Sequence, residues 1–422
     1  MQVSLCIKFG TAIILDKPRT QNGETMKTHD LNRRSFVQAM GAASLLGSLP
    51  DGAFGGRPES SMIVHEAVLA DLDAVPGNSI RFAVAGMSHD HIYGMVGAMQ
   101  RGGGVLVSAY GQEPDKLATF AKRYPDVKLV NSEDELLNDA SIQLVLSSTI
   151  PNERAPLGVR VMKHGKDFLS DKPGITTLEQ LADVRRTIAE TRRIYGIMYS
   201  ERLEVKAAVK AGELIQAGAI GRVIQTINIA PHQITQRNGD AGGGSGRPEW
   251  FWNPDLYGGI LCDIGSHQVD QFLYYTGSTE AEVVASQIAN VNHPDYPRFQ
   301  DFGDMMLRGD RGVGYVRLDW FTPDGLGTWG DGRLFVLGTE GYIEVRKYTD
   351  VAVKKSGNNL FLVDRKEARY IDCNNLTLPF GPEFLADVVN RTHLAQNQEQ
   401  CLLAAELVIK AQIKAQIAHL KA

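Results

Sequence analysis

Between residues 78 and 198, short apolar runs alternate with longer amphipathic stretches. The apolar runs predict strands at residues 80–85, 105–109, 127–130, 142–146, 167–169 and 194–198. The stretches between them predict helices, of which the clearest cover residues 114–124, 155–164 and 178–190. A regular strand–helix alternation is typical of a parallel, doubly wound sheet. We therefore expect an α/β domain with a Rossmann fold over residues 78–198.

Beyond residue 220 the pattern changes to strands joined by short turns. We predict strands at residues 223–229, 283–288, 305–308, 313–320, 334–337, 342–346, 351–354 and 360–363. Turn sequences at residues 309–312, 339–341 and 356–359 separate several of them. Short connections favour antiparallel pairing. The sequence thus predicts a second, α+β domain over residues 199–422 with a large, mainly antiparallel, open sheet.

Two segments of this second domain have a different character. Residues 398–420 are rich in alanine and leucine, with apolar spacings of three and four that predict a helix. Residues 240–246 are mostly glycine, and we interpret them as a flexible loop within the domain rather than as a linker.

Composition and charge exclude several classes of protein. The chain has 422 residues, 43% hydrophobic and 22% charged, as expected for a soluble protein of two or three domains. Its net charge of −5 offers no basic surface for nucleic acid. Its 4 cysteines form no CxxC pair and are too few for a disulfide framework. No apolar window reaches the roughly 18 residues of a membrane-spanning helix, so we expect no membrane contact in the mature form.

The first 55 residues carry a targeting pattern. Arg33 and Arg34 are followed by Phe36 and a short, weakly apolar run, which resembles a twin-arginine export signal. We expect removal of residues 1–55, with cleavage near Ala53, and export to the periplasm. Met26 is an alternative start because it lies closer to the arginines. The simpler interpretation is a chance arginine pair before an alanine- and leucine-rich helix.

A glycine-rich turn follows the first predicted strand. In a dinucleotide-binding GxGxxG turn, the glycines let the backbone approach a pyrophosphate at a helix N-terminus. Here Gly86 takes the first position, whereas Ser88 and His91 take the other two. His89, Asp90 and His91 are alternative metal ligands, but we favour a helix start, with Asp90 near the positive end of the dipole, and we assign no metal.

The second predicted strand should end near the acid that binds the ribose 2′-hydroxyl. Gly111 aligns with that acid, and Glu113 is a substitute nearby. No arginine or lysine stands beside Gly111 to hold a 2′-phosphate. The choice between NAD and NADP stays open at this point, with a slight preference for NAD.

Asp171, Lys172 and Pro173 follow the fifth predicted strand. A lysine at the carboxyl end of a parallel strand faces the crevice where ligands bind in such sheets. Its ammonium group can donate a hydrogen bond to a substrate oxygen or transfer a proton. The alternative is an ordinary surface Lys-Pro turn.

Residues 258–273 carry the strongest motif. Their apolar positions suit one helix, on which Asp263, His267 and Asp270 share a face at spacings of four and three. A carboxylate one turn from an imidazole can orient the ring and raise its basicity, which makes a general base for a hydroxyl proton. The alternative is a hydrogen-bonded helix face without a catalytic role.

From residue 78 to the C-terminus the chain resembles the glucose-fructose oxidoreductase and inositol dehydrogenase family, Gfo/Idh/MocA. Asp-Lys-Pro at residues 171–173 is similar to the family's Glu-Lys-Pro, and residues 258–270 are similar to its GGGxLxDxGxHxxD. The sequence Gly-Thr-Glu-Gly at residues 338–341 and Tyr-Ser-Glu-Arg at residues 199–202 also follow in family order. The resemblance places Lys172, Asp263 and His267 at the catalytic positions.

The resemblance also implies the cofactor side of the site. Pro151 and Asn152 are similar to the family's Pro-Asn turn beside the cofactor, and Ser148 precedes them. The family histidine near this turn is absent, and Arg154 or Ala155 stands in its place. The implied cofactor-binding set is completed by Lys172 and by the residues introduced above, Gly86, Ser88, His89, His91, Gly111 and Glu113.

The expected activity is hydride transfer between a tightly bound NAD or NADP and a sugar, polyol or glycoside. His267 would take the alcohol proton while Lys172 hydrogen-bonds the same oxygen. Arg247, Trp250, Tyr257 and His232 are the candidate substrate residues. The alternatives are a glycoside hydrolase or lyase that recycles its cofactor, and a non-catalytic dinucleotide sensor. The resemblance further implies a homo-oligomer, dimer or tetramer, paired through the second sheet.

Overall fold

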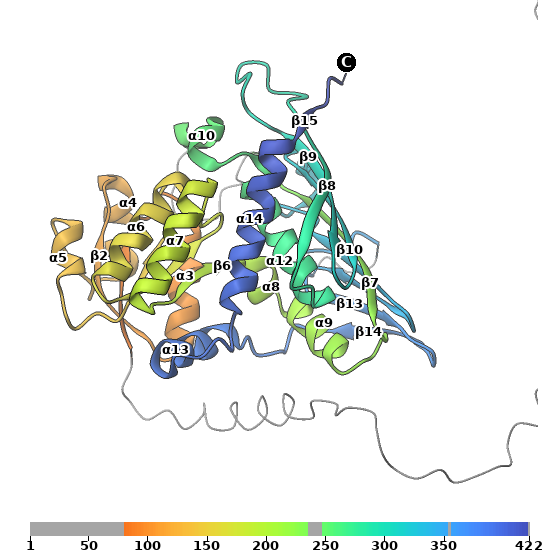
Figure 1. Ribbon diagram of the computed structural model, residues 1–422, viewed down its shortest axis with the longest axis horizontal. Helices are drawn as coiled ribbons and strands as arrows, with labels where there is room; N and C mark the ends of the chain where they lie inside the picture. The colour runs from red at the N-terminus through yellow and green to blue at the C-terminus, as the bar shows by residue number, and fades with distance from the viewer. Residues whose placement is uncertain (1–79, 235–246, 353–355, 421–422) are drawn as a thin grey trace, which may run out of the picture. The chain divides into compact units, whose positions relative to one another are not determined.

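The computed structural model describes residues 80–234, 247–352 and 356–420 (Figure 1). The predicted export signal at residues 1–55 and the predicted loop at residues 240–246 lie outside these ranges. In the described part of the chain, none of the helices has the length and apolar character that a bilayer crossing requires.

The first domain is built on a six-stranded sheet in which every pair of neighbours is parallel. The strand order β3-β2-β1-β4-β5-β6 is that of a Rossmann fold. The strands are β1 (Arg81–Ala85), β2 (Val105–Tyr110), β3 (Lys128–Leu129), β4 (Leu144–Ser147), β5 (Asp167–Asp171) and β6 (Tyr195–Met198). The helices are α3 (His91–Arg101), α4 (Pro114–Arg123), α5 (Glu133–Leu137), α6 (Pro151–Lys163) and α7 (Leu178–Thr191). The predicted parallel domain is confirmed.

Local sequence explains where these helices begin. Pro151 is the first residue of α6, a position at which the missing N–H costs nothing. Ser132 and Thr177 cap α5 and α7 by accepting hydrogen bonds from backbone N–H groups three residues on. Because β1, β4 and β5 are parallel, their carboxyl ends lie at one edge of the sheet.

The second domain is built on a nine-stranded sheet in the order β14-β13-β12-β11-β7-β10-β9-β8-β15. Its pairs are antiparallel except β7 with β10 and β8 with β15. The strands are β7 (Val223–Pro231), β8 (Ala281–Ala289), β9 (Phe302–Gly309), β10 (Val313–Asp319), β11 (Arg333–Gly338), β12 (Tyr342–Arg346), β13 (Asn359–Val363), β14 (Ala368–Asp372) and β15 (Gln416–Ile417). The predicted open, mainly antiparallel sheet is confirmed.

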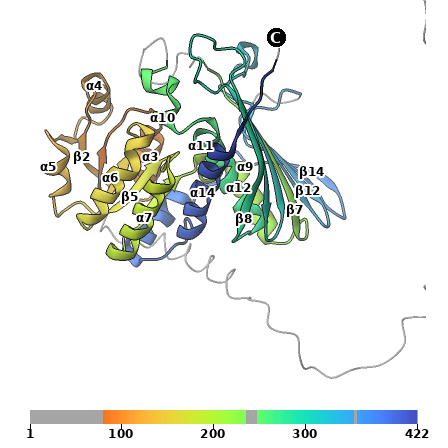
Figure 2. The ribbon, with the colours of Figure 1, turned by 45° about the horizontal axis from the view of Figure 1, so that its top comes forward.

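The remaining elements of this domain are mostly helices. They are α8 (Ser200–Leu203), α9 (Lys206–Gln216), α10 (Pro254–Tyr257), α11 (Ile260–Asp263), α12 (Gly265–Thr276), α13 (Phe380–Asn390), α14 (Gln398–Lys414) and two 3₁₀ turns, η1 (Glu249–Trp252) and η2 (Asp324–Leu326). Helix α12 packs on β7 and β10, and α14 packs between β8 of this sheet and β6 of the first (Figures 1 and 2).

Two predicted elements are wrong in extent. Residues 351 and 352 form no strand, and the rest of the predicted strand at 351–354 lies outside the described residues. The helix predicted to reach residue 420 ends at Lys414, because residues 416–417 pair with β8 instead. Strand β14 was not predicted: it is an edge strand whose side chains are mostly exposed, so it has no clear apolar alternation.

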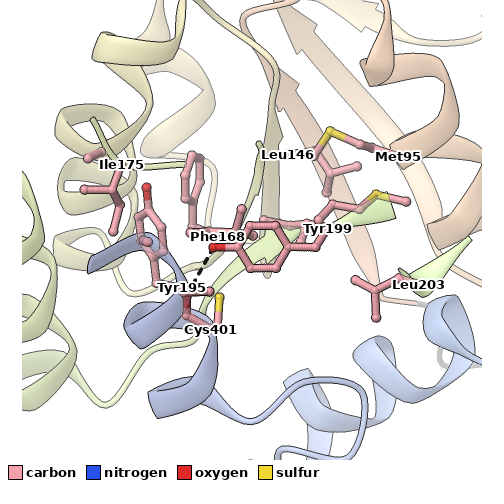
Figure 3. Close-up of a cluster of buried hydrophobic side chains, with 14 of the residues drawn as sticks. Met95, Leu146, Phe168, Ile175, Tyr195, Tyr199, Leu203 and Cys401 are labelled. Carbon is pink, nitrogen blue, oxygen red and sulfur yellow. Dashed lines mark hydrogen bonds between the residues drawn. The ribbon is translucent and has the colours of Figure 1, made fainter. Parts of the chain in front are cut away.

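Helix α14 also joins the two domains. The Gln398 amide accepts a hydrogen bond from the Tyr195 N–H (3.1 Å) and donates one to the Tyr195 carbonyl (2.8 Å). It thus pairs with backbone groups at the edge of β6, as a neighbouring strand would. Beneath it, the Tyr199 hydroxyl donates to the Cys401 carbonyl at 3.1 Å, in a buried cluster with Phe168 (Figure 3). This packing holds the carboxyl end of β5 against the second domain.

Candidate active site

Lys172 and Asp263 meet where the two domains face each other. Lys172 directly follows β5, and Asp263 is the last residue of α11. The Lys172 Nζ donates to the Asp263 Oδ1 at 2.8 Å, and the two side chains are only 6% and 13% exposed. The lysine is therefore held at the carboxyl edge of the sheet by an acid from the other domain.

The predicted face of Asp263, His267 and Asp270 does not act as one unit. The expected single helix is broken at Ile264 into α11 and α12. Asp263 accepts from Lys172, and Asp270 forms a buried, bidentate pair with Arg202. The expectation that Asp263 orients the imidazole of His267 is corrected: the His267 Nδ1 has no hydrogen-bond partner among the described residues.

His267 is nevertheless placed for proton transfer. It lines the same cavity, of about 570 Å³, as Lys172 and Asp263. Burial, followed by the nearby charge of Lys172, holds the pKa of His267 well below its usual value. Its imidazole is therefore neutral at neutral pH and has a free nitrogen lone pair.

Asp171 is the centre of a buried hydrogen-bond network. Its carboxylate pairs with the Nδ1 atoms of His89 (3.1 Å) and His91 (2.9 Å), with the Arg154 Nη2 (3.1 Å), and with the Lys172 N–H (2.7 Å). Burial opposes ionisation, but the charges of His91 and Arg154 keep the pKa of Asp171 well below its usual value. The network fixes the backbone from which the Lys172 side chain projects.

His89, His91 and Asp171 are also the one group among the described residues whose ligand atoms, all within 4.8 Å of one another, could hold a metal ion. The Arg154 guanidinium lies 3.1 Å from the same carboxylate, and both histidine Nδ1 atoms are already hydrogen-bonded to it. A cation placed there would face the guanidinium charge. The arrangement is an ion-pair network with Arg154 as its cation.

The glycine-rich turn has the shape that a dinucleotide requires. Gly86 has φ +84°, and a Cβ added to it would lie 2.6 Å from the Thr149 Cβ. Gly86, Glu113 and Asn152 line a second cavity, of about 310 Å³, beside the ends of β1 and β2. The buried Asn152 Oδ1 has no hydrogen-bond partner among the described residues. A glycine cradle at Gly86 with Glu113 and an amide without a described partner beside it fits the pyrophosphate and adenosine part of a dinucleotide.

Three predicted cofactor residues support this turn rather than line a cavity. The Ser88 hydroxyl donates to the Glu113 carboxylate, and the Ser148 hydroxyl donates to the His89 carbonyl at 2.6 Å. Gly111 packs on Met87, whose Cε would lie 3.2 Å from an added Cβ. Predicted His89, His91, Pro151 and Lys172 instead line the cavity that contains His267.

The predicted substrate residues divide in the same way. Arg247, Trp250 and His232 line the cavity of His267. Tyr257 does not: it is 1% exposed and stacks on Phe251 in the core, so its predicted role in substrate binding is corrected.

Family models match both domains. The model described as "Oxidoreductase family, NAD-binding Rossmann fold" matches residues 80–199, and the "GFO/IDH/MocA C-terminal domain" model matches residues 208–344. A crystal structure of a proposed oxidoreductase from Erwinia carotovora atroseptica SCRI1043 is 46% identical, covers 81% of this chain and 100% of its own, and superposes with a TM-score of 0.76. The chain belongs to the Gfo/Idh/MocA oxidoreductase family.

More distant members have described activities. A 1,5-anhydro-D-fructose reductase of Ensifer adhaerens is 26% identical over 197 residues, which are 45% of this chain and 55% of that protein. The chain thus matches about half the length of the curated relatives. Levoglucosan dehydrogenase in complex with NADH and levoglucosan has 15% identity and a TM-score of 0.64, covering 80% of this chain and 98% of its own. This last likeness shows the fold alone.

In this Gfo/Idh/MocA member, sequence reasoning missed part of the cavity wall. Asp171 was noted only as the neighbour of Lys172, and Gln233, Trp320, Trp329 and Tyr348 were not singled out. Trp329 carried one usable signal, because it is a large aromatic residue in a glycine-rich turn. Nothing local indicated the others, since they approach the cavity only through the pairing of distant strands.

Proposed function

We propose that the protein is an NAD-dependent oxidoreductase that transfers a hydride between a tightly bound cofactor and a sugar, polyol or glycoside. The observation that carries the proposal is the convergence of Lys172 and His267 in one cavity beside the Rossmann turn. Two potential proton-transfer groups from different domains line this one cavity.

The division of labour follows from the charges. The Lys172 ammonium, held by Asp263, donates a hydrogen bond to the reacting oxygen and stabilises negative charge that develops on it. The neutral imidazole of His267 accepts the hydroxyl proton at a nitrogen. A bound nicotinamide would supply the hydride acceptor. Asp171 acts indirectly, because it fixes the backbone of Lys172.

A carbohydrate substrate is supported by the walls and by the relatives. Trp250, Trp320 and Trp329 present aromatic faces of the kind that pack on sugar C–H groups. The relatives include proteins named 1,5-anhydro-D-fructose reductase and D-xylose dehydrogenase, and a structural neighbour is named levoglucosan dehydrogenase.

NAD is preferred over NADP on electrostatic grounds. The Glu113 carboxylate lines the cavity at the end of β2, where a 2′-phosphate would meet a like charge. Arg160 also lines this cavity, but it is engaged by Glu133 at 2.6 Å. No described cation there is left over for a 2′-phosphate.

Export and assembly complete the proposal. The arginine pair at Arg33 and Arg34 supports a twin-arginine route to the periplasm, where free nucleotide is scarce and a cofactor must be tightly held. Met306, Val313 and Tyr342 on the second sheet are 52%, 40% and 36% exposed, which supports a homo-oligomer paired through that sheet.

The test begins with the cofactor and the two catalytic candidates. Denaturation of the purified protein is expected to release NAD, identified by mass analysis. We expect Lys172→Ala and His267→Ala each to lower turnover at least about 100-fold with the cofactor retained. Lys128→Ala and His164→Ala, outside both cavities, are the matched controls.

Three outcomes separate the alternatives. Accumulation of reduced cofactor on adding a sugar supports the dehydrogenase. Product without net reduction indicates the recycling hydrolase or lyase. Near-normal turnover in His267→Ala on the substrate that reduces the cofactor would refute the assignment.

A further inference from the structure

Arg247 is fixed in the cavity wall before any ligand binds. Its Nε donates to the Ile234 carbonyl at 2.9 Å and its Nη2 donates to the Gln233 carbonyl at 2.8 Å. Its guanidinium lies over the rings of Phe251 (4.6 Å) and Trp320 (4.8 Å). The side chain is thus held from one edge and from its flat faces, so little conformational entropy remains to be lost on binding.

The guanidinium of Arg247 is charged and has N–H donors available for a ligand. Burial lowers the pKa of Arg247 to about 10, with Asp263 and Asp90 partly offsetting this effect, so the group stays protonated at neutral pH. Toward the residues that the structure describes, two of its five N–H groups donate hydrogen bonds. The edge formed by Nη1 and Nη2 remains, which is the fork that binds a carboxylate through two parallel hydrogen bonds.

No acid that lines the cavity in the described part of the chain is left to form an ion pair with Arg247. Each carboxylate that lines the cavity has its own basic partner: Asp90 with Lys116, Asp171 with Arg154, Glu201 with Lys347, Glu204 with Arg101 and Asp263 with Lys172. Among the described residues, Arg247 has no ion pair, and neither has Arg123, which is exposed at the wall over Tyr93. The positive charge of Arg247 is therefore not balanced by a paired carboxylate, and it lies at a rigid, half-buried position.

We infer that Arg247 binds a carboxylate of the substrate, so that the substrate class is a sugar acid or another polyol that bears a carboxylate. The inference rests on the proposed function, because it concerns the same cavity. A guanidinium out of bulk water without a counterion gains most from an anionic ligand. Its fork selects a planar, bidentate carboxylate, which a hydroxyl group cannot replace.

The dinucleotide pyrophosphate is the competing source of negative charge. The hydrogen bonds and ring contacts of Arg247 come from the second domain, namely Gln233, Ile234, Phe251 and Trp320. Arg247 does not line the cavity of Gly86 and Glu113, but the cavity of His232 and of the aromatic side chains that would face a sugar. His89, Asp90 and His91 of the Rossmann turn line this second cavity too, and the charge of Asp90 acts on Arg247, so retention of the cofactor by Arg247→Gln decides between the two anions.

The test is calorimetric binding to the protein with its cofactor, in buffer of fixed ionic strength. The probes are D-gluconate, D-glucuronate and D-galacturonate, each paired with a neutral counterpart, D-glucitol, D-glucose and D-galactose. We expect at least one acid to bind at least about 10-fold more tightly than its counterpart, as a charge-assisted bidentate contact does. Arg247→Gln should abolish this preference, and Arg247→Lys should reduce it. Lys122→Gln, which removes an exposed cation outside the cavity, is the matched control for a long-range charge effect and should keep it.

Several results would overturn the inference. One is the absence of any acid preference in the unmodified protein, and another is a preference that survives in Arg247→Gln. A third is loss of cofactor from Arg247→Gln with unchanged thermal stability, which would assign the guanidinium to the pyrophosphate. If Arg247→Gln fails to fold, Arg247→Lys decides, because undiminished preference there would exclude the fork.

The inference and the proposed function fail separately. Reduction of the cofactor by neutral sugars without any acid preference would uphold the dehydrogenase and refute the carboxylate site. Tight acid binding that depends on Arg247, without any reduction of the cofactor, would uphold the carboxylate site and refute the dehydrogenase.

Discussion

Glu383 is expected to make the stability of the protein fall as the pH rises. It lies in α13, is 6% exposed, and has Asp387 and Arg202 as charged neighbours. Burial, followed by the charge of Asp387, raises its pKa from about 4.5 to about 7, while Arg202 acts in the opposite direction. In the folded protein Glu383 therefore binds its proton more tightly than in the unfolded chain.

The difference between the folded and unfolded pKa of Glu383 fixes how the free energy of unfolding depends on pH. Because the folded pKa lies above the unfolded one, the stabilisation is complete below the unfolded pKa and is lost as the pH rises through about 7. With 1.36 kcal/mol for each pH unit between the folded and unfolded pKa, the loss of stability is about 3.4 kcal/mol at pH 9 and about 0.8 kcal/mol at pH 5. Glu383→Gln removes the titration while keeping a similar shape. The stability of the variant relative to the unmodified protein should therefore rise by about 2.5 kcal/mol between pH 5 and pH 9.

The assay is urea unfolding followed by tryptophan fluorescence at pH 5 and pH 9. Glu190→Gln, an exposed glutamate on α7, is the matched control and should show no such difference. A stability difference between Glu383→Gln and the unmodified protein that is equal at the two pH values would refute the reasoning, since it would mean that Glu383 titrates alike in both states.

Four further predictions test the site and the assembly. Because burial keeps the pKa of His267 well below 6.5, the acid limb of kcat/KM should lie below that pH, and a limb centred at or above it would contradict the role of the neutral imidazole. Asp270→Asn should cost about 3–5 kcal/mol in urea unfolding, because it leaves the Arg202 charge buried without its partner; a loss under about 1 kcal/mol would count against this. Gly86→Ala should purify with little dinucleotide by mass analysis, since its Cβ would meet Thr149, and full occupancy would show that the turn is not the cradle. Light scattering at micromolar concentration should give a dimer or tetramer, and a monomer mass would reject pairing through the sheet.

Much of the fold was predictable from local pattern. Four parallel strands of the first domain, β1, β4, β5 and β6, are short and mostly buried, so they appear as apolar runs between amphipathic helices. The more exposed β2 and β3 were also located. The predictions failed where tertiary contacts decide. The edge strand β14 has little apolar alternation, and residues 416–417 leave the helical pattern only because β8 offers them backbone partners.

The site shows the same division. Lys172, Asp263 and His267 were found by motif, because their spacing and their place in the chain are local properties. Which of them pair was not predictable: the break at Ile264 turns Asp263 toward Lys172, 91 residues away in sequence. Asp171 similarly joins two histidines about 80 residues earlier in the chain.

The two domains, the family motifs and the chemical groups of the site can be recognised in the amino-acid sequence, because hydrophobic periodicity depends on neighbours along the chain. The pairing of charges cannot, and it is the folded chain that leaves Arg247 without an acidic partner among the described residues. A charge, in contrast, is neutralised by whichever side chain the fold brings within a few ångströms, and its energy falls with a distance that no local pattern records.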